Sequence, residues 1–437
     1  MLDPTASAVA AEPVIPDARV GLTHFALAVG GFAIGTTEFA TMSLVPDFAR
    51  DLRIDAPTAG HVISAYALGV VVGAPTLAVL GARLPRRTML ILLMTVYAFA
   101  NALTALSPSY GWMMVFRFLS GLPHGAYFGI AALVAASLVP VRQRTQAVAR
   151  VLLGLTVATI AGVPLANWLG QTVGWRWSFG IVALLALLTV TLVAIFAPRD
   201  RPDAARSPLG ELATLKRGQV WLTLGIGAIG FGGLFAVYTY LASTLIEVTH
   251  VSPRFVPVAL MVFGIGMTGG NLIVPRFADR ALMPTAAALL VWSFMALALY
   301  PLAAGNFWAM LVDVGAIGIG GALGTVLQSR LMDVAGDAQA LAAALNHSAF
   351  NVANALGPWL GGIAIAAGLG WTSTGWVGCG LALGGLAFLL VSVALERRAD
   401  YSTTVSGFDS SIAARTMRSH TAGSPTAAIA SSGARSV

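Results

Sequence analysis

Apolar residues fill this chain in long runs, and polar residues gather in the short stretches between them. Twelve runs hold about 20 residues or more, and a helix of that length crosses about 30 Å of hydrocarbon. The pattern therefore predicts an all-α membrane protein with twelve transmembrane helices. The expected spans are residues 22–45, 58–81, 88–106, 111–138, 146–170, 175–197, 219–246, 254–275, 283–304, 307–329, 338–368 and 371–395.

The longest polar connection, Pro198–Gly218, is rich in proline and charge and separates the first six spans from the last six. After Arg398 the chain consists mainly of Ser, Ala, Thr and Gly, a composition that cannot bury enough apolar surface to fold alone. We therefore expect a cytoplasmic N-terminal tail, a six-helix bundle, a linker, a second six-helix bundle and a disordered cytoplasmic tail. The expected bounds of these five parts are 1–20, 21–197, 198–218, 219–396 and 397–437.

The two halves of the chain match each other as internal repeats. Identical residues recur at offsets of 197 or 196 residues, in the pairs Gly69 and Gly266, Gly73 and Gly270, and Trp112 and Trp308. Two related six-helix bundles are the architecture of transporters that rock one half against the other around a central site. The sequence thus predicts two pseudo-symmetric bundles.

The charged residues indicate how the chain crosses the membrane. Only 10% of the residues are charged, against about 25% in soluble domains. With a cytoplasmic start, twenty of the 25 Lys and Arg residues fall in inside segments and four in outside segments. Because basic residues favour the cytoplasmic side, both termini are expected in the cytoplasm, and the protein is expected in a bacterial inner membrane. The basic charge then serves topology, so we expect no nucleic-acid partner.

Glu38 is the most unusual residue of the first span, because it is the only charged residue between Leu22 and Val45. A charge at that depth costs about 2.5 to 3.5 kcal/mol on insertion scales and normally faces a cavity or a partner. We interpret Glu38 as a proton-binding group in a transport pathway. The alternative is a carboxyl group that stays protonated or sits in a structural ion pair.

Arg117 and Asp313 are the other ionisable residues deep in the membrane. Arg117 lies in the fourth span and Asp313 at a similar depth in the tenth. A buried guanidinium has no neutral form and needs a carboxylate or a set of acceptors. The proton-coupling set is therefore Glu38, Arg117 and Asp313, with Glu38 the expected partner of Arg117 and Asp313 the competitor.

A substrate cavity is expected from polar and aromatic residues on the first, fourth, seventh and eleventh spans. His347, Asn351 and Asn354 follow i, i+4, i+7 spacing, which puts them on one side of a helix. Two roles explain these three residues equally: hydrogen bonding between helices and contact with substrate. The other expected cavity residues are His124, Phe32, Phe39, Tyr127, Phe235 and Tyr238, although aromatic residues also pack any span.

Several motifs carry a family resemblance. Gly73–Leu90, GAPTLAVLGARLPRRTML, and Gly270–Arg280, GNLIVPRFADR, resemble the loop signature of the major facilitator superfamily. RFLSGLPHGA from Arg117 resembles its fourth-span arginine motif, and GVPLANWLG from Gly162 its antiporter motif. GTTEFATMSLVPDFARDL and HSAFNVANALGPWLGG resemble twelve-span drug:proton antiporters of the arabinose-efflux-permease-like group, which includes sugar and chloramphenicol exporters.

The resemblance assigns roles to two further sets of residues. A cytoplasmic gate is expected at Arg83, Arg86, Arg87, Asp279 and Arg280. Close helix packing is expected at Gly162, Pro164, Gly170, Gly357, Pro358 and Gly361. The acidic residue usual in the first loop signature is replaced by Ala82 here, whereas the second half keeps Asp279. Topology alone would also explain the arginines.

Together these observations predict a monomeric, proton-coupled exporter of a small amphipathic compound, drug or sugar-like, that works by alternating access. Its partners would be the substrate, protons and the lipid bilayer. It would need no cofactor beyond the proton gradient, because a single cysteine and six dispersed histidines exclude a disulfide and give no metal-ligand spacing. A proton-linked importer is the nearest alternative. No nucleophile and base pair supports an enzyme, and no soluble sensor domain supports a receptor.

Overall fold

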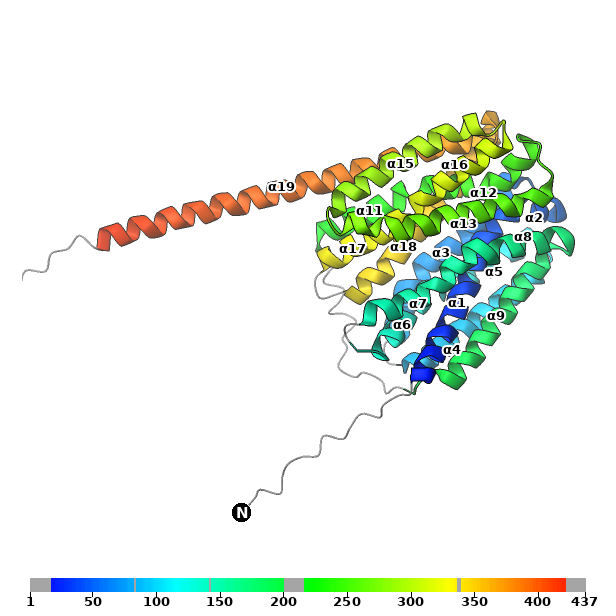
Figure 1. Ribbon diagram of the computed structural model, residues 1–437, viewed down its shortest axis with the longest axis horizontal. Helices are drawn as coiled ribbons and strands as arrows, with labels where there is room; N and C mark the ends of the chain where they lie inside the picture. Colours follow the sequence, from blue (N-terminus) through cyan, green and yellow to red (C-terminus); the bar gives the residue numbers. More distant parts are fainter. Residues whose placement is uncertain (1–16, 82–83, 141–142, 200–215, 336–338, 422–437) are drawn as a thin grey trace, which may run out of the picture. The chain divides into compact units, whose positions relative to one another are not determined.

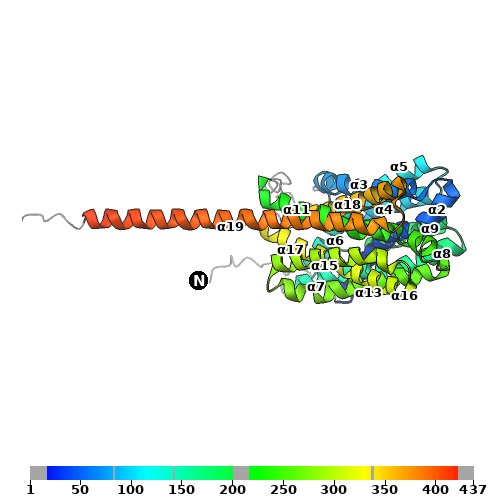
Figure 2. The same ribbon diagram turned by 90° about the horizontal axis from the view of Figure 1, so that it is seen from above.

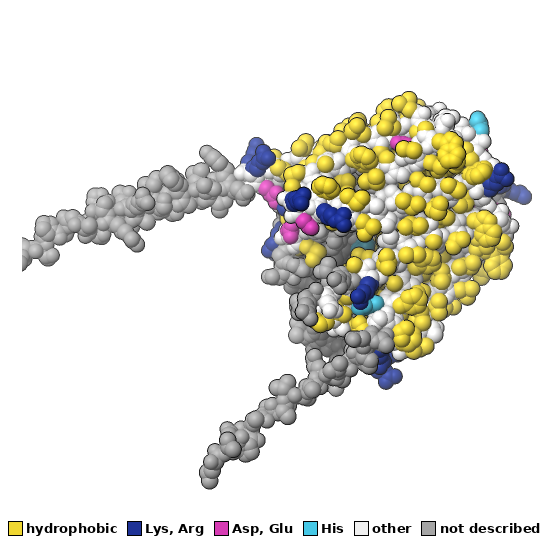
Figure 3. Space-filling view, viewed as in Figure 1, with side chains coloured by type: hydrophobic (Ala, Val, Ile, Leu, Met, Phe, Trp, Pro, Cys, Tyr) yellow, Lys and Arg dark blue, Asp and Glu magenta, His cyan; other side chains and the backbone are white. Residues whose placement is uncertain are grey.

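The twelve predicted spans are confirmed. The computed structural model describes residues 17–81, 84–140, 143–199, 216–335 and 339–421. Within them, twelve helices are long and apolar enough to cross a membrane, from Arg19–Ser43 to Ser373–Arg398. On the face drawn in Figure 3, hydrophobic side chains cover the middle of the helices, whereas Lys and Arg lie toward helix ends. Tertiary contacts divide the chain into one unit up to Leu389 and another from Leu390.

The first half of the chain forms six spans, several of which consist of two helices in succession. Its elements are α1 Asp17–Ser43, α2 Val45–Leu52, α3 Ala56–Gly81, α4 Arg86–Ala105, α5 Tyr110–Gly121, α6 His124–Ser137, α7 Arg144–Val157, the π-helix η2 Ala158–Gly162, α8 Val163–Thr172 and α9 Trp175–Phe196. Proline explains two of the divisions, since Pro123 precedes α6 and Pro164 lies in the first turn of α8. Proline has no backbone N–H to donate within a helix.

The second half repeats this arrangement. Its elements are α11 Gly218–Gly230, α12 Gly232–Glu247, η4 Pro253–Phe255, α13 Val256–Ile273, α14 Pro275–Ala278, α15 Leu282–Ala303, α16 Phe307–Ile319, η5 Gly320–Ala322, α17 Leu323–Ala335, α18 Gln339–Ala364, the π-helix η6 Ile365–Leu369 and α19 Ser373–Thr421. The sequence predicts disorder from residue 397, whereas α19 continues as helix through Thr421. A helix that is already formed in the last span can be extended at little cost, because only nucleation is expensive.

Glycine contacts within each half follow one constant offset. A Cβ atom added to Gly69 would collide with the carbonyl oxygen of Phe118, and one added to Gly266 would collide with that of Gly315. Two further contacts repeat in the same way. The contact of Gly73 with Leu122 corresponds to that of Gly270 with Ile319. The contact of Gly121 with Tyr66 corresponds to that of Gly318 with Phe263. In each case, adding 197 to both residues of the contact in the first half gives the contact in the second half. The predicted internal repeat is therefore present in the packing of α3 on α5 and of α13 on α16.

This packing register changes one detail of the predicted repeat. An offset of 197 aligns Arg117 with Val314, whereas the tryptophan spacing, at an offset of 196, aligns it with Asp313. Asp313 is therefore displaced by one residue from the position that corresponds to Arg117. One residue turns a side chain by about 100° around a helix, so the two residues face different neighbours.

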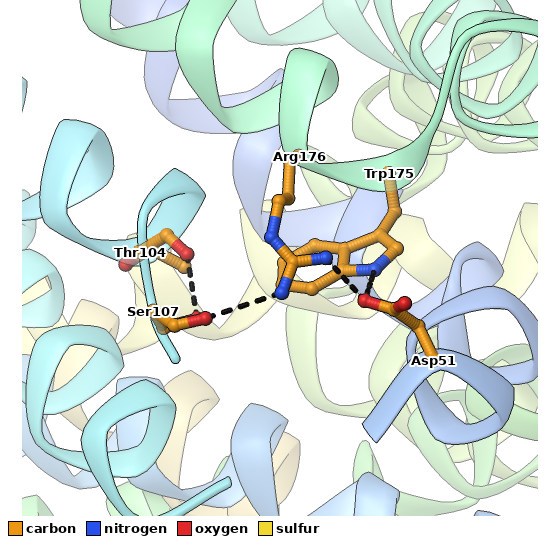
Figure 4. A network of polar contacts seen from close by, with 5 residues as sticks. All are labelled: Asp51, Thr104, Ser107, Trp175 and Arg176. Atoms are coloured by element: carbon orange, nitrogen blue, oxygen red, sulfur yellow. Dashed lines mark hydrogen bonds and ion pairs between the residues drawn. The ribbon is translucent and has the colours of Figure 1, made fainter. Parts of the chain in front are cut away.

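Helix α2 marks one end of the bundle, which we call the α2 end. Figure 4 shows how α2 is held: Asp51 forms an ion pair with Arg176 and accepts a hydrogen bond from Trp175 Nε1 at 3.0 Å. Arg176 also donates to the carbonyl oxygen of Ser107 at 3.2 Å, so α2, α9 and the end of α4 are joined. The Arg176 guanidinium holds the pKa of the Asp51 carboxyl below its usual range.

The two halves meet along α3 and α18, which lie side by side in both Figure 1 and Figure 2. Ser64 of α3 donates a hydrogen bond to the carbonyl oxygen of Ala355 at 2.9 Å. Nearer the α2 end, Gln171 Nε2 donates to the carbonyl oxygen of Pro253 at 3.0 Å. These contacts join the halves from the middle of the spans to the α2 end.

The glycine contacts give a direct test of the packing. Gly266→Ala should lower the free energy of unfolding by about 1 to 3 kcal/mol, because backbone opposes the added methyl group. Gly129→Ala is the matched control, since no atom lies within 4 Å of the added Cβ there. The control should be neutral or gain up to about 1 kcal/mol from helix propensity. Denaturant unfolding in detergent measures both variants, and equal stability would contradict the close approach of α13 and α16.

Candidate functional site

Glu38 lies in the last third of α1 and accepts a hydrogen bond from the other half of the molecule. Its side chain is 8% exposed. Asn354 Nδ2, on α18, donates to Glu38 Oε1 at 3.2 Å. Two of the residues that the sequence singles out for the site are thus in direct contact, although they are 316 positions apart. The acid of the first half is bound by an amide of the second.

Arg117 is buried, but its position differs from the one predicted. Among the described residues it forms no ion pair within 4.0 Å with Glu38 or with Asp313. Its guanidinium carbon lies 4.3 Å from the centre of the Tyr66 ring and 5.5 Å from that of Phe179. The aromatic faces stabilise the cation in place of a carboxylate. The expected direct pair between Glu38 and Arg117 is therefore not formed in this structure.

Tyr66 connects Arg117 to a second group of side chains. Its hydroxyl group and His124 Nδ1 are 2.8 Å apart, so the same phenol contacts the arginine with its ring and the histidine with its oxygen. The His124 ring lies 6.0 Å from that of His347, which stacks on Phe128 at 5.4 Å and 6°. A line of polar and aromatic side chains therefore runs from Arg117 across α6 to α18.

Three further residues belong to the site although nothing in the sequence sets them apart: Tyr66, Tyr97 and Thr37. Tyr97 lies close to Tyr66, Thr37 and Arg117. The hydroxyl groups of Thr37 and Tyr97 are buried without a well-formed hydrogen bond in the described part of the chain, as is Asn354 Oδ1. The only feature of the sequence that could have identified these residues is a polar group inside an apolar span.

Most of the predicted aromatic cavity residues form one cluster between the halves. Phe39 of α1 stacks on Phe235 of α12 at 6.2 Å and meets the edge of Tyr238 at 5.7 Å. Phe32 and Tyr127 lie elsewhere. Phe32 faces Gly162, and Tyr127 is buried in the core of the first half, where its hydroxyl donates to the carbonyl oxygen of Leu27 at 2.8 Å.

Among the remaining polar candidates, Asn351 and Asp313 do not touch Glu38. Asn351 Nδ2 donates to the backbone oxygen of His347 at 2.9 Å, one turn earlier in α18. Asp313 is 7% exposed and lies near Tyr300, and its Oδ2 has no hydrogen-bond partner among the described residues. The structure therefore brings Asn354 to Glu38 and leaves Asp313 in a separate place within the second half.

The glycine and proline motifs allow helices to approach closely. Gly162 packs on Thr36 and Phe32, and Gly170 packs on Leu44, so both face α1 or its end. Gly357 meets the backbone of Gly232 on α12. Tyr240 donates to the carbonyl oxygen of Pro358 at 3.0 Å and packs on Gly361. Pro164 begins α8 directly after the π-helix η2.

The predicted gate residues lie at the end of the bundle away from α2. Arg83 falls outside the described residues. Arg87 Nη2 donates to the carbonyl oxygen of Ala194, in the last turn of α9, and Arg86 begins α4. Asp279 and Arg280 line a cavity of about 330 Å³ with Thr325, Ser329 and Asp333. A contact of these arginines with the second half stays a prediction.

Nothing in the described residues groups three metal-ligating His, Cys, Asp or Glu side chains. What the site offers is a buried carboxyl group that accepts a hydrogen bond from an amide and lies within electrostatic reach of an arginine. Such a group can bind or release a proton, and both neighbours interact more strongly with its ionised form.

Comparison with known proteins gives a consistent result. The family model described as Major Facilitator Superfamily matches residues 27–300. The chain is 39% identical over 381 residues to the inner membrane transport protein YdhP of Escherichia coli K12, covering 87% of this chain and 97% of that protein. It is 35% identical over 381 residues to a chloramphenicol resistance protein of Streptomyces lividans, covering 86% and 94%. It is also 32% identical over 352 residues to the putative transporter AraJ of Escherichia coli K12, covering 79% and 88%.

The contact of Arg117 with Tyr66 can be tested by two substitutions. Tyr66→Phe keeps the ring under the guanidinium and loses only the hydroxyl group with its contacts to His124 and Tyr97, whereas Tyr66→Leu loses the ring as well. Tyr66→Leu should therefore lower the free energy of unfolding by about 2 kcal/mol more than Tyr66→Phe, the value of a desolvated cation–π contact. The same two substitutions in an Arg117→Leu background control for lost ring volume. If the difference persists there, the ring does not stabilise the arginine.

Proposed function

The chain belongs to the Major Facilitator Superfamily, and we propose that it is a proton-coupled transporter that exports a small amphipathic compound from the bacterial cell. As a member of that family with transporter-named relatives, it is a multi-pass membrane transporter and not an enzyme. The direction, the proton coupling and the substrate class belong to the proposal. In it, both termini lie in the cytoplasm and the α2 end faces outward, as the distribution of Lys and Arg favours.

The main observation that supports the proposal is the hydrogen bond between Glu38 and Asn354. It joins the two halves at the only acid of the first span. In alternating access the halves must separate on one side and close on the other. A protonatable group placed in the contact between the halves can bias that movement, because the free energy of the contact depends on the charge of the group. Glu38 is therefore the proton-coupling residue in this proposal.

The energy of one proton is sufficient to drive such a cycle. One elementary charge that crosses the whole membrane down a potential difference of 100 mV releases about 2.3 kcal/mol. This is larger than the net contribution of a typical hydrogen bond, about 0.5 to 1.5 kcal/mol. Binding and release of one proton on opposite sides could therefore make and break a contact such as that of Asn354 with Glu38.

The substrate site would lie among the side chains around this pair. Phe39, Phe235 and Tyr238 offer aromatic faces, and His124 and His347 offer ring nitrogens on the other side of the Tyr66 contact. Apolar faces beside a few polar groups suit an amphipathic ligand. The relatives named for chloramphenicol resistance and for transport support a small organic compound as the cargo.

A susceptibility and uptake screen would identify the cargo. An efflux-deficient host that expresses the chain would be exposed to phenicols, dyes and sugars, with chloramphenicol as the first probe. Export predicts lower accumulation of a compound in expressing cells, and the decrease should disappear when the proton gradient is collapsed. Higher accumulation would show an importer and contradict the proposed direction.

Glu38→Gln tests the coupling residue. The amide mimics the protonated carboxyl group and cannot release a proton, so uphill, proton-driven transport should fall to background at normal expression. Passive exchange of substrate can persist. Asp313→Asn is the matched control, because Asp313 is a buried acid that does not contact Glu38 or Asn354. It should have the smaller effect. Uphill transport in proteoliposomes with an imposed pH gradient measures both variants, and full activity of Glu38→Gln would move the coupling role to Asp313.

A further inference from the structure

Tyr240 lies in α12 of the second half, which packs on α2, and its side chain is fixed by its own half. The residue is fully buried. Its hydroxyl group donates a hydrogen bond to the carbonyl oxygen of Pro358, on α18, at 3.0 Å. A Cβ atom added to Gly361 would lie 3.2 Å from the ring, so the ring packs directly on the α18 backbone. The hydroxyl oxygen therefore has a defined position beside α18.

The same hydroxyl oxygen touches the first half at Gly60, in the second turn of α3. A Cβ atom added to Gly60 would collide with this oxygen and would lie 3.2 Å from the ring carbon that carries it. Real Cβ atoms essentially never come closer than 3.0 Å to another such atom. Tyr240 can therefore occupy its place in this structure only because residue 60 has no side chain.

Gly60 belongs to a face of α3 that lies against α18 toward the α2 end. Pro57, Gly60 and Ser64 follow i, i+3, i+7 spacing, which puts them on one side of the helix. A Cβ atom added to Gly362 of α18 would lie 2.7 Å from the Tyr240 hydroxyl oxygen and 3.5 Å from the carbonyl oxygen of Pro57. The hydroxyl group thus lies between two helices of different halves, with a glycine on each.

We propose that the contact of Tyr240 with Gly60 sets how readily the α2 end of the molecule closes. The inference goes beyond the proposed function, because the contact involves neither a proton nor a substrate. When the halves separate at this end, α3 moves away with the first half, whereas Tyr240 stays bound to Pro358 in the second. The contact therefore exists in the closed form alone, and a change in its fit alters the ratio of closed to open molecules.

A methyl group added at residue 60 cannot be accommodated in the closed form without cost. Rotation of the Tyr240 side chain would break its hydrogen bond to Pro358 and leave a buried hydroxyl group unpaired. Movement of α3 away from α18 would also relieve the collision, and this movement opens the α2 end. Both responses destabilise the closed form only, so both lower the ratio of closed to open molecules.

Double electron–electron resonance in lipid nanodiscs measures this ratio. In a Cys379→Ala background, Ser109→Cys and Gly305→Cys put one spin label on each half, in exposed connections at the α2 end. Gly60→Ala should lower the ratio of closed to open molecules by about fivefold or more, since overpacking a close contact is costly. An unchanged ratio would contradict the proposal.

Tyr240→Phe tests whether the hydroxyl group is the atom that residue 60 meets. It removes the oxygen with which the added methyl group collides and leaves the ring carbon at 3.2 Å, a contact that a shift of a few tenths of an ångström relieves. In a Tyr240→Phe background, Gly60→Ala should therefore lower the ratio by less than about twofold, as expected when two substitutions share one contact. If the full decrease persists without the hydroxyl group, the proposal is wrong.

Two other glycine substitutions are matched controls. Gly129→Ala adds a methyl group with no atom within 4 Å, and it should leave the ratio unchanged. Gly225→Ala adds one that meets Phe388 within the second half. This contact persists in both forms, so Gly225→Ala should lower the stability of the fold and leave the ratio unchanged. If it shifts the ratio as much as Gly60→Ala, the effect is general strain and the proposal fails.

The outcomes separate this inference from the proposed function. A decrease in Gly60→Ala that Tyr240→Phe relieves supports the contact, even if Glu38→Gln keeps full proton-driven transport. An unchanged ratio in Gly60→Ala rejects the contact, even if Glu38→Gln abolishes that transport.

A second variant serves if Gly60→Ala is not monodisperse in detergent. Tyr240→Leu removes the atoms that contact Gly60, so the closed form loses packing that the open form never has. The ratio of closed to open molecules should then fall about twofold, and an unchanged ratio would contradict the proposal.

Discussion

A carboxyl group inside a hydrocarbon layer must be neutralised by a proton or by a cation, and this constraint on Glu38 explains the arrangement around it. The amide of Asn354 binds the carboxyl group from the second half, while Arg117 lies over the face of Tyr66. The arginine is charged in every state, so its position cannot depend on Glu38 alone. The Tyr66 ring stabilises the cation whatever the charge of the carboxyl group.

The two halves share a scaffold but not their chemistry. Gly69 makes its close contact with Phe118, and Gly266 makes the corresponding contact with Gly315, 197 residues later in the chain. At that offset Glu38 corresponds to Phe235, which contributes to the aromatic cluster with Phe39. The backbone approach is thus symmetric, whereas the ionisable groups lie mainly on one side. A symmetric scaffold supports rocking of the halves, and in the proposed function the protonation of Glu38 biases that movement.

The sequence predicts the spans and the repeat well, because twenty apolar residues in a row have few alternatives to a membrane helix. It also selects Glu38 and Asn354, since polar groups inside apolar runs are rare. It does not predict the partner of Arg117. A guanidinium can be stabilised by a carboxylate or by rings, and the choice depends on helix rotation and side-chain direction. The one-residue displacement of Asp313 and the burial of Tyr127 are missed for the same reason.

Infrared difference spectroscopy of the purified protein tests most directly whether Glu38 exchanges a proton. A protonated carboxyl group has a carbonyl stretch that disappears when the group ionises. The account predicts that raising the pH of the wild-type protein in lipid removes such a band from a buried carboxyl group. The same loss should occur in Asp313→Asn and be absent in Glu38→Gln. A band that titrates unchanged in Glu38→Gln and is missing from Asp313→Asn would contradict the account.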